Sequence, residues 1–166
     1  MTINPVLHSF AYCLDFLREQ IADIDGPKMV AQPNGVINHP AWVIGHITAA
    51  THLLASTIGV PKWLSKDFIN RYRTGSVPVA DASVYENKND LLMTLREVQT
   101  RITQRIEEMT DDELDQLFPV ESYRHVFPTI RHALTQILIG HTAYHIGQVG
   151  VWRKGMGMPP MKRSFE

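Results

Sequence analysis

Apolar residues recur at alternating intervals of three and four along four long segments of the chain, and this spacing restricts the possible folds more than any other feature. It places the apolar side chains on one face of an α-helix, whereas a half-buried strand alternates at every second residue. The four predicted helices span residues 4–24, 38–58, 83–109 and 129–155. Helices that each carry one apolar face bury those faces most simply in an antiparallel bundle. The sequence therefore predicts an all-α fold, a four-helix bundle.

Capping patterns predict where several of these helices begin. Asn4 and Pro5 are expected to cap and open the first helix, because proline is favoured in a first turn. Ser83 and Glu86 match the capping box S-x-x-E and are predicted to open the third helix. A second box at residues 110–113 predicts a short helix before the last long one.

The connection between the second and third helices, residues 59–82, is unusually long. Structureless connections beyond about 12–15 residues are uncommon in compact domains, so this one is expected to hold a short helix or to cross the bundle. Trp63, Phe68 and Tyr72 give it apolar mass that can pack. The whole chain, residues 1–166, is of a length suited to one domain, so we expect a single bundle with a long crossover between helices two and three.

Three of the eight histidines fall where the helical pattern requires core-facing apolar residues. His141 and His145 lie about one turn apart, so both leave the same face of the last helix. His46 lies on the apolar face of the second helix. Buried imidazoles need partners for their ring nitrogens, and a divalent metal would serve all three. The sequence therefore predicts a metal site on these histidines.

The ligand set also predicts the kind of site. Three neutral imidazoles suit zinc, nickel, copper or ferrous iron, and three protein ligands leave a coordination position open, as in catalytic sites. Metal affinity is expected to fall below about pH 6, where imidazoles take up protons. Gln148 and Tyr144 lie beside His145 and are candidates to orient a ligand or contact substrate, although ordinary packing explains Tyr144 equally well. The remaining histidines are not expected to be ligands: His8, His39, His52, His125 and His132.

Composition bears on the partners and the compartment. A net charge of −1 gives no general attraction to nucleic acid, and no apolar run approaches the roughly 18 residues of a membrane span. The basic residues near the end of the chain alone favour DNA binding, and such tails are usually solvated. With Cys13 as the only cysteine and no pattern of a signal peptide, we expect a cytoplasmic protein that binds neither nucleic acid nor membrane.

The histidine motifs resemble those of the DinB family of metal-binding four-helix bundles. The resemblance covers nearly the whole chain and is carried by Gly45-His46 and by His141-Thr-Ala-Tyr-His145-Ile-Gly147-Gln148. It implies a divalent metal, commonly zinc or nickel, on the three histidines. It also implies transfer of low-molecular-weight thiols such as bacillithiol, mycothiol or glutathione, or, in one branch, isomerisation of maleylpyruvate.

Two further expectations accompany the resemblance. Many relatives carry arginine directly after the second motif histidine, and Ile146 at that position removes a possible contact to an anionic substrate. Many relatives also pair through bundle helices, so a homodimer is expected. Exposed aromatic surface around Trp63 and Phe68 would contribute to that dimer.

The leading functional hypothesis is a metal-dependent enzyme that transfers a thiol to an electrophilic small molecule. A metal-dependent hydrolase is an alternative, but it needs a carboxylate as general base, and the core-facing stripes of the second and fourth helices supply none. A non-catalytic bundle that only binds a metal or ligand is the other alternative.

Overall fold

The computed structural model of the protein describes residues 3–159 and residue 161, and this part is all-helical, as predicted. Within it no strand forms, and Leu117 and Thr129 make only an isolated bridge. The α-helices are α1 Asn4–Ile21, α2 Pro40–Thr57, α3 Lys66–Tyr72, α4 Lys88–Glu108, α5 Asp111–Leu114, α6 Ile130–Thr135 and α7 Thr142–Gly155. The shorter turns are η1 Gly26–Val30, η2 Pro33–Gly35, η3 Ala82–Val84, η4 Glu121–Tyr123 and the π-helical η5 Gln136–His141.

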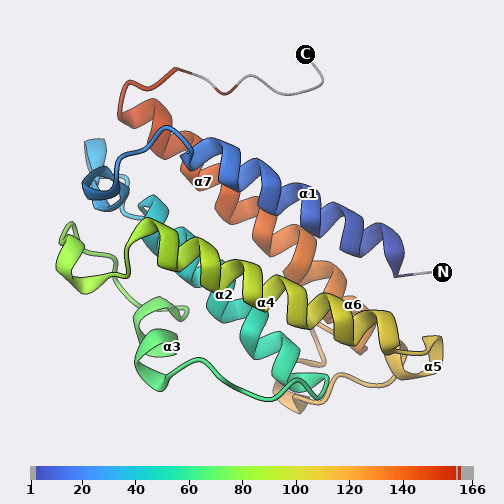
Figure 1. The fold of residues 1–166 in the computed structure, drawn as a ribbon. Helices are drawn as coiled ribbons and strands as arrows, with labels where there is room; N and C mark the ends of the chain where they lie inside the picture. Colours follow the sequence, from blue (N-terminus) through green and yellow to red (C-terminus); the bar gives the residue numbers. More distant parts are fainter. Residues whose placement is uncertain (1–2, 160, 162–166) are drawn as a thin grey trace.

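The long helices lie side by side and enclose one hydrophobic core (Figure 1). Helix α2 packs against α4 and α7, and α1 packs against α7. The apolar stripes evident in the sequence supply fully buried side chains, among them Leu14, Leu17, Ile47, Leu95, Ile102 and Trp152. In the described part of the chain, no helix is both long and apolar enough to cross a membrane.

Helices α2 and α4 run in the same direction. Arg105, near the end of α4, donates a hydrogen bond to the Ile58 carbonyl just after α2, at 2.8 Å. At the other end of α4, Lys88 donates to the Ile24 carbonyl after α1, at 3.0 Å. Residues 59–87 therefore return along the length of the helices before α4 begins (Figure 1). This connection holds a short helix, α3, as expected for a segment of its length.

The observed helix starts agree with the capping patterns only in part. The capping box at Thr110 and Glu113 is confirmed, with both reciprocal hydrogen bonds present. The box predicted at Ser83 is wrong, because α4 begins later, at Lys88, with Asn87 as its N-cap. The Asn87 side chain accepts from the Asp90 backbone amide at 3.0 Å. Ser83 instead lies in the short turn η3.

Two local features explain where the sequence pattern misled. Glu86 does not reach back to a helix start, because its carboxylate binds Arg71 and accepts from the Tyr72 hydroxyl at 2.5 Å. At α1, the N-cap is Ile3 rather than Asn4, and Asn4 is the first helical residue. The Ile3 side chain offers no capping bond, so the start of α1 depends on its packing and on Pro5 in the first turn.

The last long helix is interrupted by the π-helical turn η5, which the sequence pattern did not predict. A π turn inserts one extra residue into the helical repeat and shifts the face that later residues present. The Thr142 hydroxyl accordingly donates to the carbonyl of Ile137, five residues earlier, at 3.0 Å. His141 is the last residue of this turn, and His145 lies in α7 beyond it.

The expected exposed aromatic surface of the long connection is not present. Phe68 is only 7% exposed and belongs to the hydrophobic core. The Trp63 ring packs edge-on against His52, with 4.4 Å between ring centroids. The Arg101 guanidinium lies over the other part of that ring, 4.2 Å from its centroid. Because both aromatic residues are already in contact within the chain, they do not supply a free surface for a partner.

Candidate metal centre

The three predicted histidines come together between α2 and the last long helix. One ring nitrogen from each of His46, His141 and His145 lies within 4.8 Å of the others. The Nε2 atoms of His46 and His141 are 3.0 Å apart. His46 and His145 are buried and His141 is half-buried. Within residues 3–159 and 161, no fourth His, Cys, Asp or Glu side chain joins this group.

The position of His46 depends on α3 and on a glycine. The Nδ1–H of His46 donates to the backbone carbonyl of Tyr72 at 2.6 Å, which leaves the Nε2 lone pair free. The Tyr72 ring lies so close to α2 that a Cβ on Gly45 would be 2.3 Å from it. Trp42 stacks on the other side of the imidazole, with 4.5 Å between centroids and an angle of 11°. Gly45-His46 is thus a structural unit, in which the glycine lets α3 reach the histidine.

His145 is oriented by a short chain of amide side chains. Its Nδ1 lies 3.0 Å from the Gln148 Oε1, and that same oxygen accepts from the Asn38 amide at 3.0 Å. Since Nδ1 must donate in this arrangement, the Nε2 of His145 is left with its lone pair. Asn38 was missed as a site residue, because its place before α2 fits a turn residue equally well. Tyr144 is 67% exposed and its ring meets His145 edge-on, 5.1 Å between centroids.

His141 gives the strongest sign of an additional partner. Its Nδ1 is buried and has no hydrogen-bond partner among the described residues. Its Nε2 faces the Nε2 of His46, whose Nδ1 already carries the proton. Three converging imidazoles are a donor set that suits a divalent transition metal, and a shared cation would satisfy lone pairs that otherwise face one another. The residues present therefore fit a metal.

Burial keeps these imidazoles neutral. It lowers the pKa of His141 to about 4, with a further contribution from the neighbouring His145 and His46. It likewise lowers the pKa of His145 to about 4 and lowers the pKa of His46. Neutral imidazoles have the free lone pair that ligation needs, so the site is competent for a metal at and well below neutral pH.

Two cavities border the histidine group. The first, of about 340 Å³, is lined by His46 and His141 together with mostly apolar side chains, and we call it the apolar cavity. The second, of about 660 Å³, is lined by Asn38, Tyr144 and Gln148, which surround His145. Small molecules could therefore reach the group from two directions.

The other histidines lie apart from this group, as predicted. His39 caps α2, since its Nδ1 accepts from the Trp42 amide at 3.2 Å. His52 is buried against Trp63, and His132 bonds the Thr129 hydroxyl. His8 and His125 are exposed.

Ile146, the residue that departs from the arginine of many relatives, is 3% exposed and packs in the hydrophobic core. Its side chain belongs to the core in this chain, so the loss of a substrate contact at this position does not follow from the structure.

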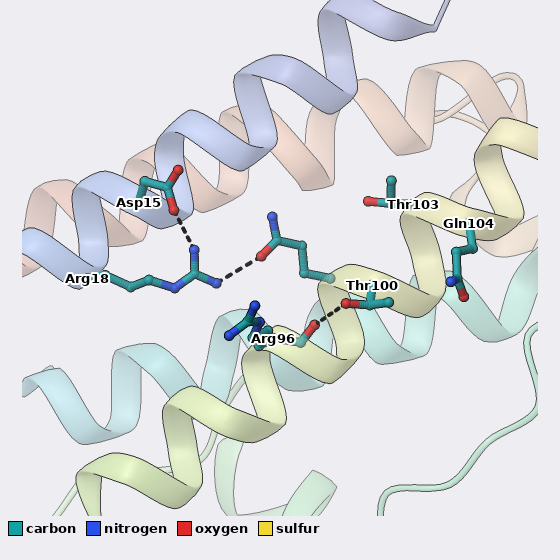
Figure 2. Close-up of a pocket in the computed structure, with 7 residues that line it drawn as sticks. Asp15, Arg18, Arg96, Thr100, Thr103 and Gln104 are labelled. Atoms are coloured by element: carbon teal, nitrogen blue, oxygen red, sulfur yellow. Dashed lines mark hydrogen bonds and ion pairs between the residues drawn. The ribbon is translucent and has the colours of Figure 1, made fainter.

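A third hollow lies between α1 and α4, away from the histidines (Figure 2). Arg18 donates to Asp15 at 2.6 Å and to Gln99 at 2.8 Å, and Thr100 bonds the Arg96 carbonyl. Much of the polar lining of this cleft is thus bonded within the cleft itself (Figure 2).

Comparison with known families agrees with the motifs. The family model described as the DinB superfamily matches residues 11–149, a span that contains all three histidines and Gln148. No curated protein matches the chain.

Proposed function

The chain belongs to the DinB superfamily, and on that premise we propose that it is a divalent-metal-dependent enzyme that transfers a low-molecular-weight thiol to an electrophilic small molecule. We assign His46, His141 and His145 as the metal ligands, with zinc or nickel as the metal. Gln148 orients His145 and, with Tyr144, borders the space for substrate. The observation that carries this proposal is the convergence of three neutral imidazoles with no fourth protein ligand in the described chain.

The proposed chemistry uses the site as follows. A divalent cation on three imidazoles lowers the pKa of a bound thiol, so that the thiolate predominates near neutral pH. The Tyr72 carbonyl and Gln148 hold two of the rings in the tautomer that ligates. The presence of two cavities beside the group supports a reaction between two molecules, one in each space.

The alternatives are a metal-dependent hydrolase and a non-catalytic binding bundle. Hydrolysis is less favoured because neither cavity beside the histidines is lined by a carboxylate that would act as general base. Glu86 binds Arg71 and Tyr72 and lines neither cavity. A purely structural metal would be enclosed by protein ligands, whereas this group borders two cavities.

Metal analysis tests the ligand assignment. Protein purified without a metal-affinity tag should contain about one divalent ion per chain, and His141→Ala or His145→Ala should abolish it while the helical circular dichroism signal persists. His132→Ala, at a position outside the group, is the matched control and should keep the metal. Full metal content in both ligand variants would refute the assignment and the enzymatic proposal with it.

Activity is tested next with the metal-loaded protein. Glutathione, bacillithiol or mycothiol should add to a chromogenic aryl halide in a reaction that His141→Ala eliminates. Metal binding without turnover for any of these thiols, combined with ester hydrolysis, would favour the hydrolase.

We also propose that the chain is a single DinB-like four-helix bundle over residues 1–166, with the long connection as its crossover, and that it forms a homodimer. The parallel α2 and α4 support the crossover. Sedimentation should show twice the chain mass, and a monomer at high micromolar concentration would contradict the dimer.

A further inference from the structure

The apolar cavity has walls from several parts of the chain. Helix α2, the segment after α3, the 118–127 region and the turn η5 all contribute. Apolar members of the lining include Leu53, Leu54, Phe118, Val120, Phe127 and Ile137. Leu53 and Val120 remain 39% and 36% exposed although they are large and apolar. Apolar surface left in contact with water beside a functional group is typical of a site for an apolar ligand.

One charged side chain lines this cavity. Arg73 follows α3 directly, next to Tyr72, whose carbonyl positions His46. Among the described residues, the Arg73 guanidinium has no hydrogen bond or ion pair, and the cavity lining contains no acidic residue. Arg71, two residues earlier, is by contrast already bound to Glu86. The cavity thus combines apolar walls, a single unpaired cation and the edge of the histidine group.

We propose that the apolar cavity binds a small molecule with an apolar, preferably aromatic, body and one anionic group. The body packs against Leu53, Phe118 and Phe127, while the Arg73 guanidinium forms paired hydrogen bonds with the carboxylate or a similar oxyanion. Only the role of this molecule as the electrophilic substrate rests on the proposed function; its binding does not.

Charge and size define the ligand class. A cationic ligand would meet the unpaired guanidinium with no acid to offset it, and a strongly polar body would lose its hydration against apolar walls. The volume of about 340 Å³ lies at the lower end of the roughly 300–1,000 Å³ of small-molecule pockets, which favours a compact molecule.

Matched probes separate the two halves of the site. 4-Phenylbutyrate and its neutral analogue 4-phenylbutanol are titrated into the metal-loaded protein and into the chelator-treated protein, with binding followed by ligand-observed NMR. We expect both to bind, with the carboxylate tighter. In Arg73→Gln the affinity for phenylbutyrate should fall about three- to tenfold and that for phenylbutanol should stay the same. The control Arg96→Gln, which changes an arginine of the cleft in Figure 2, should alter neither.

A second pair of variants tests the apolar half. Ala50 lines the cavity, so Ala50→Leu should fill part of it and weaken both probes. Ala22→Leu adds the same side chain at an exposed position after α1 and should weaken neither. Circular dichroism and metal content, unchanged in all four variants, exclude misfolding as the cause.

The outcomes distinguish this inference from the proposed function. Equal phenylbutyrate affinity in wild type and Arg73→Gln overturns it, as does binding that Ala50→Leu leaves intact. Phenylbutyrate binding that requires the metal but ignores Arg73 places the carboxylate on the metal and also overturns it. A chain without metal whose cavity still shows both the Arg73 and the Ala50 effects would sustain the inference while the metal-dependent function fails.

Discussion

At the scale of single residues, the two glycines of the histidine motifs have different physical roles. Gly45 is required by contact, since any side chain there would meet the Tyr72 ring at 2.3 Å. Gly147 has open space, because a Cβ at that position would have no neighbouring atom within 4 Å. The sequence pattern presents both simply as motif glycines, and only the packing of α3 separates them.

We therefore expect Gly45→Ala to reduce the free energy of unfolding by about 1–3 kcal/mol, as overpacked cores do. It should also weaken metal binding, because a displaced Tyr72 withdraws the carbonyl that orients His46. Gly147→Ala is the matched control and should be neutral or stabilising by up to about 1 kcal/mol. Urea unfolding and metal titration measure both effects, and equal behaviour of the two variants would contradict the contact role of Gly45.

His39 offers a second prediction at this scale. Its Nδ1 accepts from the Trp42 amide and its Nε2 bonds the Val79 carbonyl, so the neutral ring caps α2 and ties the long connection to it. His39→Ala should cost about 1–2 kcal/mol of unfolding free energy, because both backbone groups lose their partner. His39→Asn should recover part of this loss, because asparagine is a good N-cap. Thermal unfolding at about pH 7.5 compares the two, and a fully stable His39→Ala protein would refute the capping role.

At the scale of helices, the sequence predicted which elements form better than where they begin. The three-four spacing predicted each long helix because the apolar face must be buried. The start of α4 was misplaced because Ser83 and Glu86 satisfy a local pattern, while Glu86 is engaged by Arg71 and Tyr72, which are distant in sequence. A local rule has no means to register that competition.

The candidate site follows the same division. The phase of the apolar stripes identified His46, His141 and His145, because the residues that share one helical face follow from their spacing. The Tyr72 carbonyl that orients His46 was not predictable, since a backbone oxygen carries no sequence signal. Arg73 was missed as well, because only the fold brings it beside the histidines.

Capping variants test the corrected start of α4. Asn87→Ala should destabilise the protein by about 1 kcal/mol, because the Asp90 amide loses its acceptor. Ser83→Ala should have a smaller effect, since Ser83 lies in the turn η3 outside α4. Denaturant midpoints at constant m-value give the comparison, and a larger effect of Ser83→Ala would favour a helix start at the capping box instead.

At the scale of the whole molecule, buried neutral histidines couple folding to pH. Burial lowers the pKa of His39, His141 and His145 to about 4 each, against about 6.5 in an unfolded chain. Between these values the unfolded chain binds more protons than the folded one. The contribution of these groups to stability is therefore full above about pH 6.5 and is lost as the pH falls toward about 4.

We expect the metal-free protein to lose thermal stability progressively between about pH 6.5 and pH 4, and His39→Asn to make that slope shallower. The metal-loaded protein should resist acid further, because bound metal stabilises only the folded state. Within the folded protein, proton competition for His141 and His145 should begin near pH 4–5, lower than the ordinary imidazole pKa suggests. Melting temperatures that do not vary between about pH 7 and pH 4.5 would contradict this coupling.

The stacking of Trp42 on His46 has a consequence for how the site can be observed. The indole lies nearly parallel to the imidazole, 4.5 Å away between centroids, and its N–H is held by Ser76 at 2.9 Å. An ion that draws electron density from His46 acts on a ring in direct contact with a fluorophore. The emission of this tryptophan should therefore follow site occupancy, with open-shell nickel quenching it far more than closed-shell zinc, so the chain contains its own optical reporter.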